Sequence, residues 1–139
     1  MTVPFVAAAF ATVLAMLGLG VVAVAHLRGF LAAVPSIDTE DDLDAYRRVA
    51  AWNIYGALVF LGLSVVWGGA VFAEFAFGNP AWTTGTMISM IVFGPLLTAV
   101  GLYVRKLESR VQATPATDEF LAERDRVTHV WMHKPLPDW

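Results

Sequence analysis

Three long apolar runs without a charged side chain limit what this chain can fold into. They cover Pro4–Ala25, Val49–Ala73 and Pro80–Val104. About 20 consecutive apolar residues cross the hydrocarbon core of a bilayer as a helix. A soluble helical bundle of 139 residues would not need three such runs, because a core that faces water needs only one apolar stripe per helix. The runs therefore predict three transmembrane helices in an all-α membrane protein.

The composition agrees with this interpretation and excludes several classes of function. The chain is 58% hydrophobic and 15% charged, with a formal net charge of -3 and Cys 0. Without cysteine it has no disulfides and no thiolate metal sites. Acidic and basic residues are mixed in both polar segments, so we expect no nucleic-acid partner. An excess of arginine over lysine, with abundant alanine and valine, favours a prokaryotic source.

Helix-breaking residues mark the ends of the predicted helices. Pro35 ends the first, Thr39 is placed to cap the second, and Gly78-Asn79 separates the second from the third. Thr114-Pro115 then separates the third helix from the remaining residues. The predicted helices cover about 4–33, 40–77 and 80–113, within a transmembrane domain that covers 1–113.

The C-terminal segment 114–139 has a different pattern. Phe120, Val127 and Trp131 recur at helical spacing among charged residues, which predicts a short amphipathic helix on the cytoplasmic side. We expect its apolar face to pack against the ends of the second and third helices or the lipid headgroups. The rival is a disordered tail, but the segment is rich in large apolar residues. Beyond Pro135 we expect an unstructured tail.

The distribution of basic residues predicts how the chain is threaded. The sequence has Lys+Arg 9, all within the segments 26–48 and 105–134, and none within 1–3 or 74–79. Because lysine and arginine accumulate in cytoplasmic loops, we expect a multi-pass cell-membrane protein with its N-terminus outside and its C-terminus in the cytoplasm. Ala23-Val24-Ala25 fits a signal-peptide cleavage site, but the apolar stretch is too long and lacks a basic start, which favours a retained helix.

Small residues recur along the three apolar helices. Small side chains let helix backbones approach closely in lipid, so we expect these faces to join the three helices, or to hold a partner helix or a second copy. Pro95 lies inside the third helix and predicts a kink. The predicted packing residues are Ala7, Ala11, Ala15, Ser64, Gly68 and Gly94, with Gly18 and Gly20 extending the first face.

Few polar side chains lie in or near the apolar runs. Glu74 is one turn from Gly78, so we expect it to reach the outer headgroups; a position inside the bilayer would instead mark a proton or cation site. Asn53 and Ser64 are the other polar candidates of the second helix. For Asn53 we expect hydrogen bonds to a neighbouring helix rather than to a ligand.

A metal or cofactor site has weak candidates only. Asp125, His129 and His133 share one helix face at i, i+4 and i+8, but a fourth ligand is missing and Pro135 follows closely. His26 is expected to be an interfacial residue rather than a haem ligand, because no second axial ligand stands out at membrane depth. No nucleophile–base pair, phosphate loop or paired carboxylate is present, so we expect neither an enzyme nor a bound cofactor.

The layout resembles a prokaryotic family of small three-helix integral membrane proteins of unknown function. The resemblance rests on the charged, tyrosine-containing segment 36–48 and on the basic exit of the third helix at Tyr103-Val-Arg-Lys106. It covers about residues 4–110, and 114–139 departs from it. It implies a three-helix membrane fold, and it brings no catalytic residues because the family has no assigned chemistry.

These observations lead to one main functional hypothesis. We expect a non-enzymatic accessory, assembly or regulatory subunit of a membrane complex, whose partners are the lipid bilayer and other membrane subunits or a second copy. One alternative is a component of a small oligomeric transporter or channel that works through Glu74, Asn53 and Pro95. Another is a metal- or cofactor-binding membrane anchor that uses His26 or the pair His129 and His133.

Overall fold

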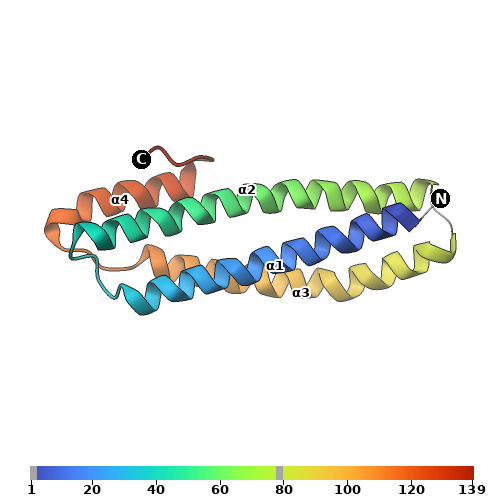
Figure 1. Cartoon of the computed structure of the whole chain (residues 1–139), viewed down its shortest axis with the longest axis horizontal. Coiled ribbons are helices and arrows are strands. Elements are labelled where there is room, and N and C mark those ends of the chain that lie inside the picture. Colours follow the sequence, from blue (N-terminus) through green and yellow to red (C-terminus); the bar gives the residue numbers. More distant parts are fainter. Residues whose placement is uncertain (1–2, 78–79) are drawn as a thin grey trace. The chain divides into compact units, whose positions relative to one another are not determined.

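The computed structural model describes residues 3–77 and 80–139, and apart from one isolated bridge every regular element in these ranges is an α-helix (Figure 1). Three helices are long and apolar enough to cross a membrane. The prediction of an all-α chain with three helices of membrane-spanning length is confirmed. The helices are α1 (Val3–Ala33), α2 (Glu40–Phe77), α3 (Pro80–Gln112) and α4 (Asp118–His133).

Local hydrogen bonds explain why α2 begins where it does. The backbone N–H of Asp42 donates to Thr39 Oγ1 at 3.2 Å, and the N–H of Thr39 donates to Asp42 Oδ2 at 3.1 Å. This reciprocal pair satisfies backbone donors that the first turn of a helix leaves free. The predicted break at Gly78-Asn79 lies outside the described residues.

The chain forms two compact units, and α1, α2 and α3 each contribute to both. One unit contains residues 1–21 and 59–102, and the other contains 22–58 and 103–139. We call them the apolar unit and the polar unit. This division differs from the predicted one at residue 113, because the C-terminal segment packs with parts of all three long helices.

The polar unit has a continuous core around Tyr46. The Tyr46 ring centroid lies 5.8 Å from that of Phe30 and 6.1 Å from that of Trp131. The Tyr46 hydroxyl and Thr128 Oγ1, on α4, are 2.6 Å apart and share a hydrogen bond. These contacts hold α4 beside the first part of α2 (Figure 1). Fully buried members of this core include Leu27, Ile37, Leu43, Tyr46, Val111 and Val127.

The apolar face predicted for the C-terminal helix is used as expected. Val127 is fully buried, and Phe120 and Trp131 are partly buried against the same core, which includes Leu107 of α3. Arg124 also donates from its guanidinium to the carbonyls of Gln112 and Thr114, at 3.2 and 3.1 Å. A basic side chain at a helix C-terminus satisfies carbonyls that the last turn leaves free.

The connection between α1 and α2 is tied to the segment before α4. The N–H of Ile37 donates to the carbonyl of Pro115 at 2.8 Å, and the N–H of Thr117 donates to the carbonyl of Ile37 at 3.1 Å. These two bonds form a short parallel bridge between Ile37 and Ala116. Residues 114–117 are therefore held in place on both sides, which orients the start of α4.

The prediction of an unstructured tail beyond Pro135 is wrong. Asp138 accepts a hydrogen bond from Lys134 Nζ at 2.6 Å and pairs with Arg126 at 3.1 Å. Trp139 packs against the core of the polar unit. The two prolines end α4 but do not prevent the last residues from folding back, because the indole supplies apolar area and Asp138 finds two cations.

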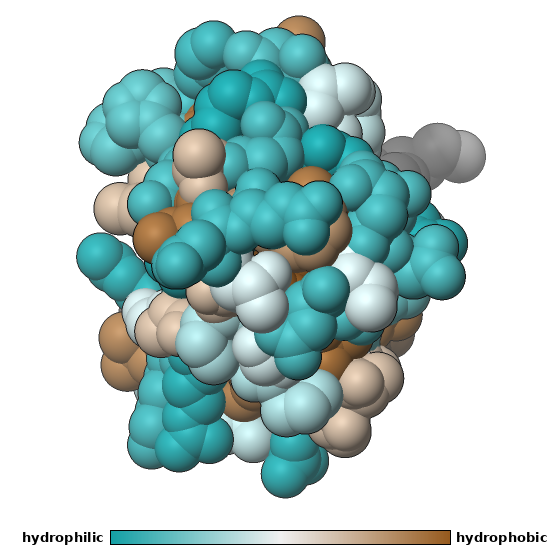
Figure 2. Space-filling model, turned by 90° about the vertical axis from the view of Figure 1, so that its left-hand side faces the viewer, coloured by the Kyte–Doolittle hydropathy of each residue, from teal (hydrophilic) through white to brown (hydrophobic). Residues whose placement is uncertain are grey.

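The surfaces of the two units differ in polarity. The face of the polar unit seen in Figure 2 is mostly hydrophilic. In the apolar unit, large apolar side chains are exposed instead, as expected where lipid rather than water surrounds a helix. The most exposed of these include Leu61, Val65, Phe72, Phe77, Ile91 and Leu102.

Candidate functional site

Glu74 is buried in the apolar unit, and its expected place at the depth of the outer headgroups stays a prediction. Only 1% of the residue is exposed. Neither carboxylate oxygen has a hydrogen-bond partner among the described residues. Buried polar groups are nearly always hydrogen-bonded, so such an exception requires an explanation.

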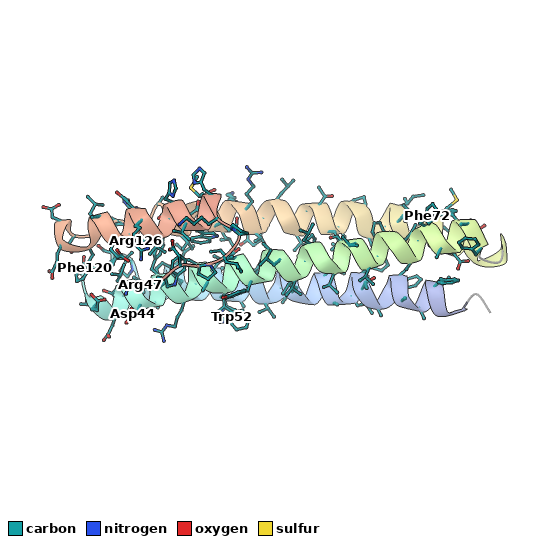
Figure 3. The ribbon with its side chains drawn as sticks, turned by 90° about the horizontal axis from the view of Figure 1, so that it is seen from above. Asp44, Arg47, Trp52, Phe72, Phe120 and Arg126 are labelled. Atoms are coloured by element: carbon teal, nitrogen blue, oxygen red, sulfur yellow. The ribbon has the colours of Figure 1, made fainter. Side chains whose placement is uncertain are left out.

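The direction of the side chain, rather than its distance from the helix end, explains this burial. Glu74 follows buried Val71 by three residues and half-buried Trp67 by seven, so all three lie on one stripe of α2. Phe72 lies on another face of the helix, is 70% exposed and projects outward in Figure 3. The side chain of Glu74 therefore lies on the inward stripe of α2.

Two threonines are the other buried polar residues described in the apolar unit. Thr12 belongs to a buried stripe of α1, and Thr86 of α3 is 1% exposed. Thr12 Oγ1 donates to its own helix, at 2.8 Å from the carbonyl of Ala8 and 2.9 Å from that of Ala9. Each of the three long helices thus contributes one buried polar residue to this unit. The sequence interpretation missed Thr12 and Thr86, although the spacing of Ala9, Thr12, Val13 and Met16 matches one face of a helix.

Apart from Gly20, the predicted small-residue positions do not join the three helices in this structure. Ala7, Ala11 and Ala15 are exposed, and a different face of α1 is turned inward. Side-chain atoms added at Gly68 or Gly94 would meet nothing within 4 Å. Ser64 donates to the carbonyl of Phe60 in its own helix at 2.8 Å. Helices that are apolar on all sides offer no polar face to show which small residues point inward, so spacing alone selected the wrong stripe.

Gly20 is a position where α1 and α3 approach closely. A Cβ atom built there would lie 2.6 Å from Val100 Cγ1. Only a glycine leaves room for α3 at this point of α1. Pro95 is accommodated within α3, which continues through it as one helix, and Thr98 Oγ1 donates to the carbonyl of Gly94 at 2.9 Å.

The hydrogen bonds expected between Asn53 and a neighbouring helix are not seen among the described residues. Asn53 is half-buried, and its amide makes no hydrogen bond to any described residue. His26, on α1, stacks on Trp52 of α2 with ring centroids 5.0 Å apart. Both rings line an apolar groove of about 510 Å³ in the polar unit, together with Arg48.

The three metal-ligand candidates of α4 do not converge. Asp125 pairs with Arg124 at 3.0 Å, and the rings of His129 and His133 stack at 4.5 Å. His133 Nδ1 also lies 3.1 Å from the carbonyl of His129. Within 3–77 and 80–139, no group of three His, Cys, Asp or Glu side chains could hold a metal ion. The i, i+4, i+8 spacing puts the groups on one face, but each has another partner.

An ion-pair network connects α2 and α4 in the polar unit. Arg47 of α2 pairs with Asp44 at 2.8 Å and with Glu123 of α4 at 3.1 Å, and Arg126 pairs with Glu123 at 2.7 Å. Figure 3 shows Asp44, Arg47 and Arg126 gathered at this end of the two helices. Hydrogen bonds from Arg126 and then Arg47 lower the pKa of Glu123 from 4.5 to about 2.

This lowered pKa predicts an acid-sensitive contact between α2 and α4. A group whose pKa is lower in the folded state stabilises the fold above its unfolded pKa. The contribution of Glu123 is therefore complete above pH 4.5 and is lost as the pH falls from 4.5 to about 2. We expect thermal unfolding of the protein in detergent to show this loss, and Glu123→Gln to lose less stability over the same range. Glu119→Gln, at an exposed position of α4, is the control and should behave like the wild type.

A scan against protein-family models and searches of curated proteins and solved structures return no match for this chain. The resemblance of residues 4–110 to small three-helix membrane proteins therefore stays a prediction. Burial, contacts and charge single out Glu74 in the apolar unit and the network of Arg47, Glu123 and Arg126 in the polar unit.

Proposed function

We propose that this chain is a non-enzymatic integral membrane protein that acts as an accessory, assembly or regulatory subunit of a membrane complex. One observation carries the proposal: the small-residue face of α1, formed by Ala7, Ala11 and Ala15, is exposed and unused by the chain itself. In lipid, helices associate through such faces because small side chains permit close backbone contact. A face of this kind that is not buried within the chain suits a helix of another subunit or of a second copy.

The polar unit supports the same proposal. Its α4 is anchored to α2 by the Tyr46–Thr128 hydrogen bond and by the Arg47–Glu123 ion pair. A charged surface held in one conformation binds a partner without the loss of entropy that ordering a flexible segment would cost. The polar unit is therefore suited to contact soluble domains of the complex.

The proposal predicts that enlarging the α1 face weakens association but leaves the chain folded. Ala11→Leu and Ala15→Leu add bulk at exposed positions, so we expect the unfolding temperature of the isolated chain to stay unchanged. Copurification from mild detergent should lose the partner, or the size of the purified protein should fall if the partner is a second copy. Ala99→Leu makes the same change at an exposed position of α3 and should affect neither. A chain that migrates alone at native levels, with no partner to lose, would contradict the accessory role.

We also propose an orientation in the cell membrane, with the N-terminus outside and the C-terminus in the cytoplasm. The support is that all basic side chains lie within 26–48 and 105–134. A reporter fused after Trp139 should be active only in the form that requires the cytoplasm. Activity of an exported reporter at that position would reverse the orientation.

Burial of Glu74 favours a second candidate function, a component of an oligomeric transporter or channel. Ionisable side chains inside a membrane protein often mark ion or proton pathways. Three helices are too few for most transport paths, so a path would require several copies. Flux in proteoliposomes that disappears in Glu74→Gln would place this candidate above the accessory role.

A further inference from the structure

The apolar groove of the polar unit lies where the apolar runs of the sequence give way to charged segments. Its lining comes from residues 25–34 and 45–52. Ala25 is the last residue of the first apolar run and Val49 is the first of the second, and both line the groove. In helices that cross a membrane, the ends of the apolar runs lie at the depth of the lipid headgroups. The groove therefore reaches from the edge of the hydrocarbon core into the headgroup region.

Small residues of α1 leave the floor of the groove open. Gly29 and Ala33, one helical turn apart, both line it, and both are exposed. A Cβ atom built at Gly29 would meet nothing within 4 Å. The volume of about 510 Å³ lies in the range of pockets that hold small molecules. An open groove with this apolar lining suits a hydrocarbon chain, because burial of apolar surface there is favourable.

Arg48 supplies a positive charge without a partner in the chain. Among the described residues that line the groove it is the only Lys, Arg, Asp or Glu. Arg48 is exposed and makes no ion pair or hydrogen bond with any described residue. Asp44, at the position four residues earlier that could pair with it, pairs with Arg47 at 2.8 Å instead. The Arg48 guanidinium is therefore available to an anion from outside the chain, and its planar N–H groups match phosphate oxygens.

Two aromatic rings add polar groups beside Arg48. Trp52 lies one helical turn after it, is 57% exposed and stacks on His26 at 5.0 Å. Neither ring forms a hydrogen bond with the described residues. A tryptophan with an apolar ring and one N–H donor is stable at the headgroup level of a membrane. The groove thus combines an apolar floor with polar groups that face the headgroups.

We propose that this groove binds one anionic phospholipid, with an acyl chain along Gly29 and Ala33 and the phosphate on Arg48. A phospholipid joins a hydrocarbon chain to a phosphate at the depth where the groove lies. An anionic lipid is favoured over a zwitterionic one, because the headgroup cation of a zwitterionic lipid offsets the charge that attracts Arg48. The site lies within one chain and does not rest on the accessory role.

Native mass spectrometry of the full chain in detergent tests the charge part of the proposal. The protein is titrated with phosphatidylglycerol and, separately, with phosphatidylcholine of the same acyl chains. We expect one phosphatidylglycerol to bind with a Kd about fivefold lower than that of phosphatidylcholine, the value of one basic side chain at a lipid surface. Arg48→Gln should abolish this preference. Arg28→Gln removes the same charge from an exposed position of α1 outside the groove, and it should keep the preference.

A second pair of variants tests the apolar floor. Gly29→Leu places a side chain in the open space and should displace about two methylene groups of the lipid, so the affinity for both lipids should fall about tenfold. The variant should stay folded, since leucine favours a helix more than glycine does. Ala32→Leu adds bulk at an exposed position of α1 outside the groove and should bind both lipids like the wild type.

The wild-type protein alone can contradict the proposal, without dependence on the folding of a variant. Equal affinity for the two lipids would overturn it. Displacement of phosphatidylglycerol by millimolar inorganic phosphate would also overturn it, because the site would then recognise phosphate without a lipid chain. If Gly29→Leu kept its lipid binding but reduced the size of the purified protein, the groove would hold a second copy instead of a lipid.

Discussion

Replacement of Tyr46 with alanine is expected to lower the free energy of unfolding by about 3–5 kcal/mol, the range for removal of a large buried ring. Tyr46 is fully buried and contacts rings from two other helices, Phe30 and Trp131. Its loss would leave a cavity between α2 and α4 and would also remove the hydrogen bond to Thr128. Chemical denaturation in detergent measures the change, and amide exchange should increase first in α4.

Two further variants separate the ring from the hydroxyl group. Tyr46→Phe keeps the ring, so we expect it to lose only the net value of one hydrogen bond, about 0.5–1.5 kcal/mol. Tyr55→Ala removes a tyrosine from the same helix at a position that is 51% exposed, and its effect should be small. If Tyr46→Ala were no more destabilising than Tyr55→Ala, α4 would not be held by this core.

Gly20→Val is expected to destabilise the apolar unit by about 1–3 kcal/mol, the usual cost of overpacking a tight contact. A Cβ atom at this position would lie 2.6 Å from Val100 Cγ1, so α1 and α3 must separate or Val100 must move. Val100 is β-branched and stiff, which limits its ability to adjust. Thermal unfolding of the purified variant measures the loss.

Gly18→Val is the matched control for this experiment. It makes the same substitution one half-turn earlier in α1, where an added Cβ would meet nothing within 4 Å. We expect little change in stability, because the new methyl groups would face lipid. Equal effects at both positions would mean that α1 and α3 do not approach closely at Gly20.

Most of the helix boundaries could be predicted from the sequence. The lengths of the apolar runs and the residues Pro35 and Thr39 act locally, so the end of α1 and the bounds of α2 agree with expectation within a residue. The amphipathic α4 could be predicted for the same reason. In water its apolar and polar faces must separate, and the spacing of Phe120, Val127 and Trp131 records that separation.

The direction of side chains in the three long helices was decided only by the tertiary structure. In lipid an apolar side chain is stable on either side of a helix, so the sequence of α1 does not distinguish exposed Ala11 from buried Thr12. For the same reason Glu74 could be assigned a depth in the helix but not the inward face on which it lies. The ion pairs of Glu123 and the packing of Trp139 also required the fold, because they join residues far apart in the chain or beyond its last helix. Local signals along the chain set where the helices begin and end, because they act within a few residues, whereas contacts between distant residues select the side chains that the helices enclose.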